Sequence, residues 1–109
     1  MESNNKLISF KNVDEAKALL DESRKDIDEI DNNLFDLISK RTSFARNIAL
    51  SKKYLGMPIY DKEREDAIHE KIRRLSKENN LDVDIVDQIV NMLTILSKNE
   101  QKEILKEEC

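Results

Sequence analysis

Apolar residues recur every three or four positions over a long first segment of the chain, which is the pattern of one face of an α-helix. The apolar positions of this face are Ile27, Ile30, Leu34, Leu37, Ile38, Ala45 and Ile48. Asn12 can cap the start of the helix, and the next sequence that would end it is Gly56-Met57-Pro58. We therefore predict one helix from about residue 13 to residue 55.

Two shorter helices are predicted after this turn. Asp61 is a good N-cap for a helix over about 61–79, with Ile68, Ile72 and Leu75 as its apolar positions. Asp82 or Asp84 then begins a helix over about 83–106. Its expected inward positions are Val86, Ile89, Val90, Leu93 and Leu96. No segment alternates as a strand does, so the pattern predicts an all-α fold with three helices per chain. Residues 1–11 are expected to be a flexible leader and residues 12–109 a single domain.

The first helix is too long for one compact domain to cover. A helix of roughly 43 residues extends about 64 Å, whereas a domain of this size has a radius of gyration near ~13 Å. A second copy of the chain is the best cover for the apolar face. We therefore predict a homodimer built around this helix.

Composition narrows the possible partners and compartment. Charged and hydrophobic residues each make up 39% of the 109 residues, and the net charge is −4. An acidic chain is a poor match for a phosphate backbone, so nucleic acid is not an expected partner. The single cysteine, Cys109, excludes a disulfide framework and a zinc cluster and is expected to be an exposed thiol. The N-terminus has no long apolar run, which predicts no signal peptide, no membrane span and a cytoplasmic location.

Two cations occupy positions of the first apolar face where Leu or Ile is expected. Arg41 and Lys52 are about three turns apart, so they project on nearly the same side, roughly 16 Å apart along the axis. Long basic side chains are rarely buried unless an anion meets them. The pair therefore indicates a site for a small polyanion.

Polar residues also interrupt the inward faces of the other two predicted helices. Ser97 and Gln101 are spaced i, i+4 on the third helix and point the same way. Glu65 falls on the apolar stripe of the second helix, one turn after Asp61 and beside Arg64. Packing the three helices together predicts one polar pocket that contains cations, carboxylates, a hydroxyl and an amide.

Arg24 cannot share a small ligand with Arg41 of its own chain. It lies roughly 25 Å along the helix and about 100° around it from Arg41. If two long helices pair antiparallel, Arg24 of the partner subunit can reach the pocket. The geometry thus suggests a site completed across the dimer.

Each of these residues also has an ordinary structural explanation. Arg41 and Lys52 can snorkel or form salt bridges, with Asp31 as a neutralising carboxylate on the same face. Ser97 can hydrogen-bond to its own helix, and Asp61 is first an N-cap. Arg64 and Glu65 can be an exposed ion pair, and His69 is interpreted as a solvated surface residue. The joint occurrence on three helices favours the pocket.

These residues and their spacings resemble the all-helical (AroQ class) chorismate mutases over about residues 20–106. The resemblance rests on the stretch 24–31, on Leu34, Leu37, Ile38, Lys40-Arg41, Lys52, Pro58-Ile59, Asp61, Arg64-Glu65, Leu81-Asp82, Ser97 and Gln101. It implies an intertwined, domain-swapped dimer with two active sites, no metal and no cofactor. The implied substrate is chorismate, a small dicarboxylate. By resemblance, Arg24 of the partner subunit and Arg41 bind its two carboxylates, with Ser97 assisting.

The resemblance also implies roles for the remaining pocket residues. Lys52 and Gln101 hydrogen-bond the ether oxygen of the breaking bond, while Glu65 and the backbone at Asp61 hold the ring hydroxyl. Arg64 supports the groups that bind the carboxylates. The implied catalytic set is Lys52, Gln101, Arg41 and Glu65.

The implied activity is an isomerase reaction, the rearrangement of chorismate to prephenate for phenylalanine and tyrosine biosynthesis. We expect a monofunctional enzyme, and the sequence leaves open whether it is an excised domain. Two alternatives remain: an isochorismate pyruvate-lyase on the same fold, and a helical dimerisation module without catalysis.

Overall fold

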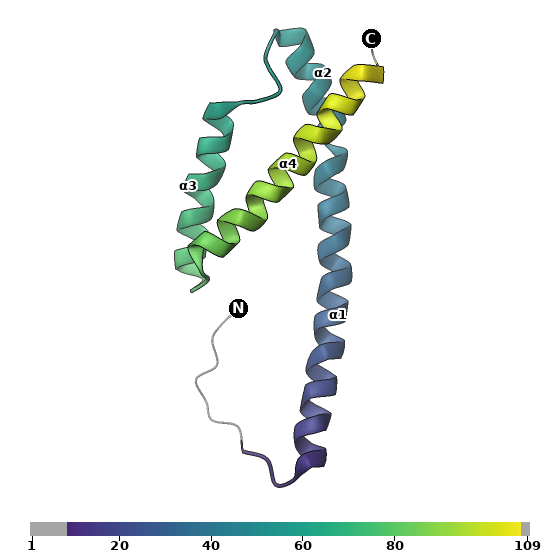
Figure 1. Cartoon of the computed structure of the whole chain (residues 1–109), viewed down its shortest axis with the longest axis vertical. Helices are drawn as coiled ribbons and strands as arrows, with labels where there is room; N and C mark the ends of the chain where they lie inside the picture. The colour runs from purple at the N-terminus through teal and green to yellow at the C-terminus, as the bar shows by residue number, and fades with distance from the viewer. Residues whose placement is uncertain (1–8, 108–109) are drawn as a thin grey trace. The chain divides into compact units, whose positions relative to one another are not determined.

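The structure is a computed structural model that describes residues 9–107 (Figure 1). Within this range it contains no strand and four helices: α1 (Val13–Ser43), α2 (Ala45–Leu55), α3 (Lys62–Glu78) and α4 (Val83–Glu107). The predicted all-α class is confirmed. The expectations for residues 1–8 of the leader and for Cys109 lie outside the described residues.

Phe44 divides the segment that the sequence predicts as one helix over about 13–55. The Ser43 hydroxyl donates a hydrogen bond of 2.6 Å to the Lys40 carbonyl, which a regular helix would give to the Phe44 N–H. That N–H instead donates to the Arg41 carbonyl at 3.3 Å. The backbone of Phe44 keeps helical angles, φ −71° and ψ −11°. A serine bonding back to its own helix is therefore the cause of the interruption.

The described residues fall into two compact units, 9–39 and 40–107. In the first unit, the Asn12 side chain accepts the Glu15 backbone N–H at 2.9 Å, which is the predicted N-cap of α1. No residue of α1 is buried. Its apolar face is open along the unit, with exposed fractions of 51–63% at Ile27, Ile30, Leu34 and Leu37.

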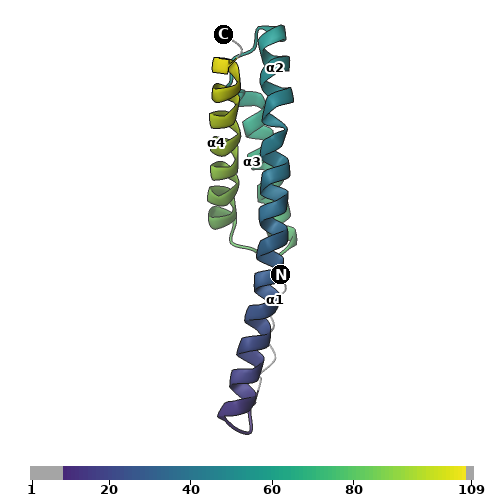
Figure 2. The same ribbon diagram turned by 90° about the vertical axis from the view of Figure 1, so that its right-hand side faces the viewer.

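The second unit is organised by α4, which packs against both α2 and α3. Figure 2 shows α4 and α2 side by side, with α3 behind them. Ala45 and Ala49 of α2 are completely buried, and Ile104 of α4 is 6% exposed and packs with them. Alanine side chains at this contact let the two helix backbones approach closely.

The connection between α2 and α3 is set by a glycine and an aspartate. Gly56 has a φ of 69°, a left-handed conformation that ends α2, and the Met57 N–H closes the motif on the Lys52 carbonyl at 2.8 Å. Asp61 then caps α3, its side chain accepting the Arg64 backbone N–H at 3.0 Å. Both helix boundaries follow from residues that the sequence marks.

Asp82 begins α4 by accepting the Ile85 N–H at 3.0 Å. The predicted inward positions of this helix are only partly right. Val86, Val90 and Leu93 are half-buried, whereas Ile89 and Leu96 are 57% and 43% exposed. The reason is that α4 packs through a face about 100° around from these two residues.

His69 is not the solvated surface residue that the sequence suggests. Its Nδ1 lies 2.5 Å from a carboxylate oxygen of Asp87, and the His69 side chain is 33% exposed. The pair links α3 to α4. Two helical turns further along α3, Ser76 is only 1% exposed, and within residues 9–107 its hydroxyl has no hydrogen-bond partner.

Candidate active site

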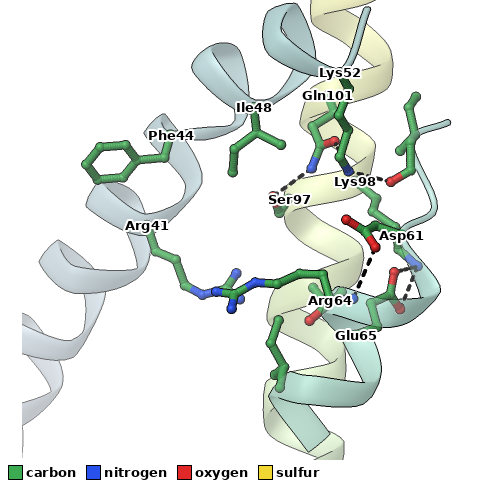
Figure 3. Close-up of a pocket in the computed structure, with 13 residues that line it drawn as sticks. Arg41, Phe44, Ile48, Lys52, Asp61, Arg64, Glu65, Ser97, Lys98 and Gln101 are labelled. Carbon is green, nitrogen blue, oxygen red and sulfur yellow. Dashed lines mark hydrogen bonds and ion pairs between the residues drawn. The ribbon is translucent and has the colours of Figure 1, made fainter. Parts of the chain in front are cut away.

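The unit formed by residues 40–107 contains a cavity of about 310 Å³ (Figure 3). It lies between the end of α1, the helices α2, α3 and α4, and the loop that precedes α3. Seven residues singled out from the sequence line it: Arg41, Lys52, Asp61, Arg64, Glu65, Ser97 and Gln101. The volume is at the lower end of the range for small-molecule sites.

Lys52, Gln101 and Ser97 form a hydrogen-bonded chain along one wall of the cavity. The Lys52 Nζ donates to the Ile59 carbonyl at 2.6 Å and to Gln101 Oε1 at 3.0 Å. Gln101 Nε2 in turn donates to Ser97 Oγ at 3.1 Å. Gln101 is 4% and Ser97 9% exposed. The chain joins α2 to α4 and holds all three side chains in fixed positions.

Two guanidinium groups face the cavity from different helices. Arg41, at the end of α1, donates from Nη1 to the Leu93 carbonyl at 3.1 Å. In Figure 3 the side chains of Arg41 and Arg64 extend toward one another. Within residues 9–107, no carboxylate lies within ion-pair distance of either guanidinium. The salt-bridge explanation of Arg41 therefore does not hold in the described residues, and both groups can receive an anion.

The first turn of α3 brings two carboxylates to the cavity. Asp61 uses one oxygen to cap the helix at the Arg64 N–H, so its position is fixed by the backbone. Glu65 follows one turn later and is 15% exposed. The Arg64 side chain pairs with neither of them, so the exposed Arg64–Glu65 pair that the sequence allows is absent from the described residues.

Sequence reasoning missed Lys98, which also lines the cavity. Its Nζ lies 3.2 Å from Glu65 Oε2, and 5.3 Å from the centre of the Tyr60 ring. Lys98 follows Ser97 by one residue and so sits about 100° around α4 from it, off the interrupted apolar face. No signal within its own helix marks it, because its partners come from α3 and the preceding loop.

Apolar side chains form the rest of the lining. Phe44, Ile48, Ile59 and Ile68 come from four different segments around the cavity. Only Ile48 and Ile68 were expected to face inward from periodicity. Together they provide an apolar surface on which the carbon skeleton of a small ring can rest.

The charges of the cavity oppose the charge of the whole chain. Its lining includes the cations Arg41, Lys52, Arg64 and Lys98, but only the carboxylates Asp61 and Glu65. This excess of two positive charges occurs in a chain of net charge −4. The cavity is thus suited to a ligand with two negative charges.

Arg24 lies on α1 in the unit formed by residues 9–39 and is exposed. It is the one predicted site residue that belongs to this other unit. Its expected role depends on a second copy of the chain.

Comparison with known proteins assigns the family. The family model described as "Chorismate mutase type II" matches residues 23–102, a range that contains every predicted site residue from Arg24 to Gln101. The chain belongs to the chorismate mutase type II family. A curated relative, the chorismate mutase of Methanocaldococcus jannaschii, is 47% identical over 88 residues, covering 81% of this chain and 89% of the relative.

A bifunctional relative and a solved structure are also similar to this chain. A bifunctional chorismate mutase/prephenate dehydratase of Buchnera aphidicola is 34% identical over 100% of this chain, which spans 25% of that protein. The solved structure titled "NMR structure of monomeric chorismate mutase from Methanococcus jannaschii" matches with a TM-score of 0.63 and 42% identity. That match covers 82% of this chain and 93% of the solved one.

Within residues 9–107, no helix is both long and apolar enough to cross a membrane. No group of three or more histidine, cysteine, aspartate or glutamate side chains in the same range is placed to hold a metal ion.

Proposed function

We propose that the protein is a chorismate mutase that rearranges chorismate to prephenate, and that the cavity of the 40–107 unit is its active site. The observation that carries this proposal is the meeting of Lys52 and Gln101 at 3.0 Å on the wall of a cavity with surplus positive charge. Membership of the family supports the reaction.

The reaction is an intramolecular [3,3] rearrangement, in which one carbon–oxygen bond breaks while one carbon–carbon bond forms. It needs no nucleophile, proton transfer or cofactor. The protein lowers the barrier by holding the substrate in its reactive chair and by stabilising the charge that builds on the ether oxygen. A rigid cavity with fixed donors is sufficient for both tasks.

Lys52 and Gln101 are proposed to supply the donors to the ether oxygen. An ammonium group has three hydrogens, and Lys52 uses two, on Ile59 and Gln101. The Gln101 amide nitrogen has two, and one is used on Ser97. Each group therefore keeps one hydrogen for the substrate without breaking an existing bond, which makes the donors preorganised.

The carboxylates of chorismate are proposed to meet the arginines. Arg41 is free of carboxylate partners in the described residues and binds one of them. Ser97 Oγ accepts from Gln101 and keeps its own hydrogen to donate to the ligand. Arg64 adds positive charge beside Arg41, and Arg24 of the partner subunit is proposed to bind the second carboxylate.

Glu65 and the backbone at Asp61 are proposed to hold the ring hydroxyl. A carboxylate is a strong acceptor for a hydroxyl group. Glu65 is mostly buried on the wall of the cavity, and Asp61 is held beside it by its capping bond. These two residues orient the ring against the apolar lining.

We also propose that the protein is a homodimer with shared active sites, in which α1 helices of two copies cover each other's apolar surfaces. Two exposed stripes support this. One runs along α1 through Ile27, Ile30, Leu34 and Leu37, which are 51–63% exposed. The other runs along α4 through Ile85, Ile89, Met92 and Leu96, which are 43–62% exposed. Continuous apolar stripes of this kind are typical of association surfaces. The related M. jannaschii structure is titled monomeric, so oligomeric state is the property to measure.

A mixing experiment tests the shared site directly. Arg24→Ala and Lys52→Ala variants are each expected to be nearly inactive. In a mixed dimer, one of the two sites combines an intact Lys52 with an intact Arg24 of the partner subunit. Random exchange of subunits should then restore about a quarter of the unmodified activity. Absence of any recovery after verified exchange would refute the shared site.

The activity itself is tested by incubating the purified protein with chorismate and, separately, with isochorismate. Prephenate formation from chorismate supports the proposal. Release of pyruvate from isochorismate without prephenate formation would replace it with the lyase activity. If neither product forms and an oxabicyclic dicarboxylate mimic of the transition state does not raise the melting temperature, the protein is a non-catalytic module.

A further inference from the structure

Lys98 is the cation of the cavity to which the proposed mechanism gives no role. Its Nζ lies 3.2 Å from Glu65 Oε2 and 3.3 Å from Glu65 Oε1, so one ammonium group spans both oxygens. The two side chains are 25% and 15% exposed. The pair joins α4 to α3 at the cavity wall.

This pair differs from the ion pairs elsewhere in residues 9–107 that join lysine to a carboxylate. Lys62 with Asp66 and Lys106 with Glu103 lie within single helices, and their side chains are 62–73% exposed. Such pairs contribute little, because water screens them. The Lys98–Glu65 pair is largely shielded from water and is formed between helices, so its geometry is set by the fold.

The ionised carboxylate of Glu65 would repel a dicarboxylate ligand, and the charge of Lys98 reduces this repulsion. The proposed substrate carries two negative charges, and an uncompensated Glu65 would repel it at close range. Lys98 neutralises that charge while leaving free lone pairs on both Glu65 oxygens, because an ionised carboxylate has about four acceptor positions. Glu65 is thereby able to accept the ring hydroxyl without opposing the binding of the dicarboxylate.

We propose that Lys98 is a positioning residue of this active site: it neutralises Glu65 and holds its carboxylate facing the cavity. The proposal rests on the chorismate mutase function proposed above. Lys98 acts through Glu65 and is not assigned a contact with the reacting atoms.

Tyr60 also contacts Lys98. The Lys98 Nζ lies 5.3 Å from the centre of the Tyr60 ring, within the range of a cation–π contact. The ring thus favours the position that the ammonium group has beside Glu65. Tyr60→Phe keeps the aromatic face and should preserve KM, whereas Tyr60→Leu should raise KM by about threefold.

The test compares steady-state kinetics of full-length variants at position 98. Lys98→Met removes the charge and keeps the length of the side chain. Because repulsion of the dicarboxylate acts on the bound substrate and the transition state alike, KM for chorismate should rise by about 10- to 100-fold, with kcat changed less than about threefold. Lys98→Arg should restore KM to near the unmodified value. Lys102→Met, an exposed lysine one turn along α4, is the matched control and should leave both constants unchanged.

A double variant tests whether Lys98 acts through Glu65. In a Glu65→Gln background, Lys98→Met should change KM by less than about twofold, because no charge remains to neutralise. An equal loss in both backgrounds, or an unchanged KM in Lys98→Met, overturns the proposal. If Lys98→Met does not fold by circular dichroism, Lys98→Gln takes its place. Absence of prephenate formation by the unmodified protein would instead refute the function itself.

Discussion

Replacement of Lys52 by methionine separates the proposed catalytic contribution of its charge from its contribution to folding. Methionine has nearly the same length and shape but no charge and no hydrogen to donate. Lys52 lies on α2 with its ammonium group between the Ile59 carbonyl and the Gln101 amide oxygen, at 2.6 Å and 3.0 Å. The substitution removes both bonds and the hydrogen that we assign to the ether oxygen.

The expected magnitudes differ between stability and catalysis. The Ile59 carbonyl and Gln101 Oε1 each lose a hydrogen-bond donor, which lowers the stability by about 1 kcal/mol per acceptor. Part of this loss is offset, because folding no longer has to remove water from the charged ammonium group. The free energy of unfolding should therefore fall by no more than about 2 kcal/mol. Loss of one preorganised donor to a developing oxyanion costs ~10²–10³ in rate. Because that charge exists only in the transition state, the loss should fall on kcat and not on KM.

The assay is steady-state formation of prephenate from chorismate, with thermal unfolding recorded for each variant. Lys53→Met is the matched control, because Lys53 is the adjacent residue of α2 and its side chain is exposed. It should have the kcat, KM and melting temperature of the unmodified protein. A folded Lys52→Met variant whose kcat falls by less than about tenfold would refute the assignment of Lys52 to the ether oxygen.

Three further substitutions test other parts of the structure. Gln101→Glu can donate to the ether oxygen only when protonated, so kcat should be low at neutral pH and rise as pH falls; a flat pH profile would contradict this. Leu37→Ser removes a side chain that is 63% exposed and that we place in the dimer contact of both copies. It should raise the dimer dissociation constant about 30- to 150-fold by sedimentation equilibrium, and an unchanged constant would exclude this contact. Ser76→Ala removes a buried hydroxyl without a partner and should increase the free energy of unfolding by about 1–2 kcal/mol in urea titrations, whereas a decrease would indicate an unseen bond.

The helices and most of their ends were predictable because their signals are local. Asn12, Asp61 and Asp82 each accept the N–H three residues ahead, as capping residues do. The division at Phe44 was not predicted, since a serine hydroxyl competing for one carbonyl leaves the apolar periodicity intact. The prediction that Ile89 and Leu96 face inward was wrong for the described residues. Helical periodicity identifies the apolar face of a helix, but it does not say which part of that face a neighbouring helix covers.

The cavity was predictable as far as its residues interrupt apolar faces. Arg41, Lys52, Ser97 and Gln101 each stand where their own helix calls for an apolar side chain, and the structure brings them to one cavity. Lys98 does not interrupt an apolar face of its helix. Its proposed role depends on the carboxylate of Glu65, which lies opposite it on α3. Pairings of this kind, like that of His69 with Asp87, require the relative placement of two helices, which helical periodicity does not contain.

Two buried alanines set the tolerance of the proposed active site. Ala45 and Ala49 are fully buried where α2 meets α4, and Lys52 and Gln101 project from those same helices one turn beyond this contact. Any branched residue at either alanine would have to separate the helix axes, and the two donors would separate with them. Overpacking at this contact costs about 1–3 kcal/mol of stability, and the same shift would lengthen the 3.0 Å hydrogen bond between Lys52 and Gln101. Sequence change at these alanines is therefore constrained by the geometry of the proposed site as well as by stability, although neither residue lines the cavity.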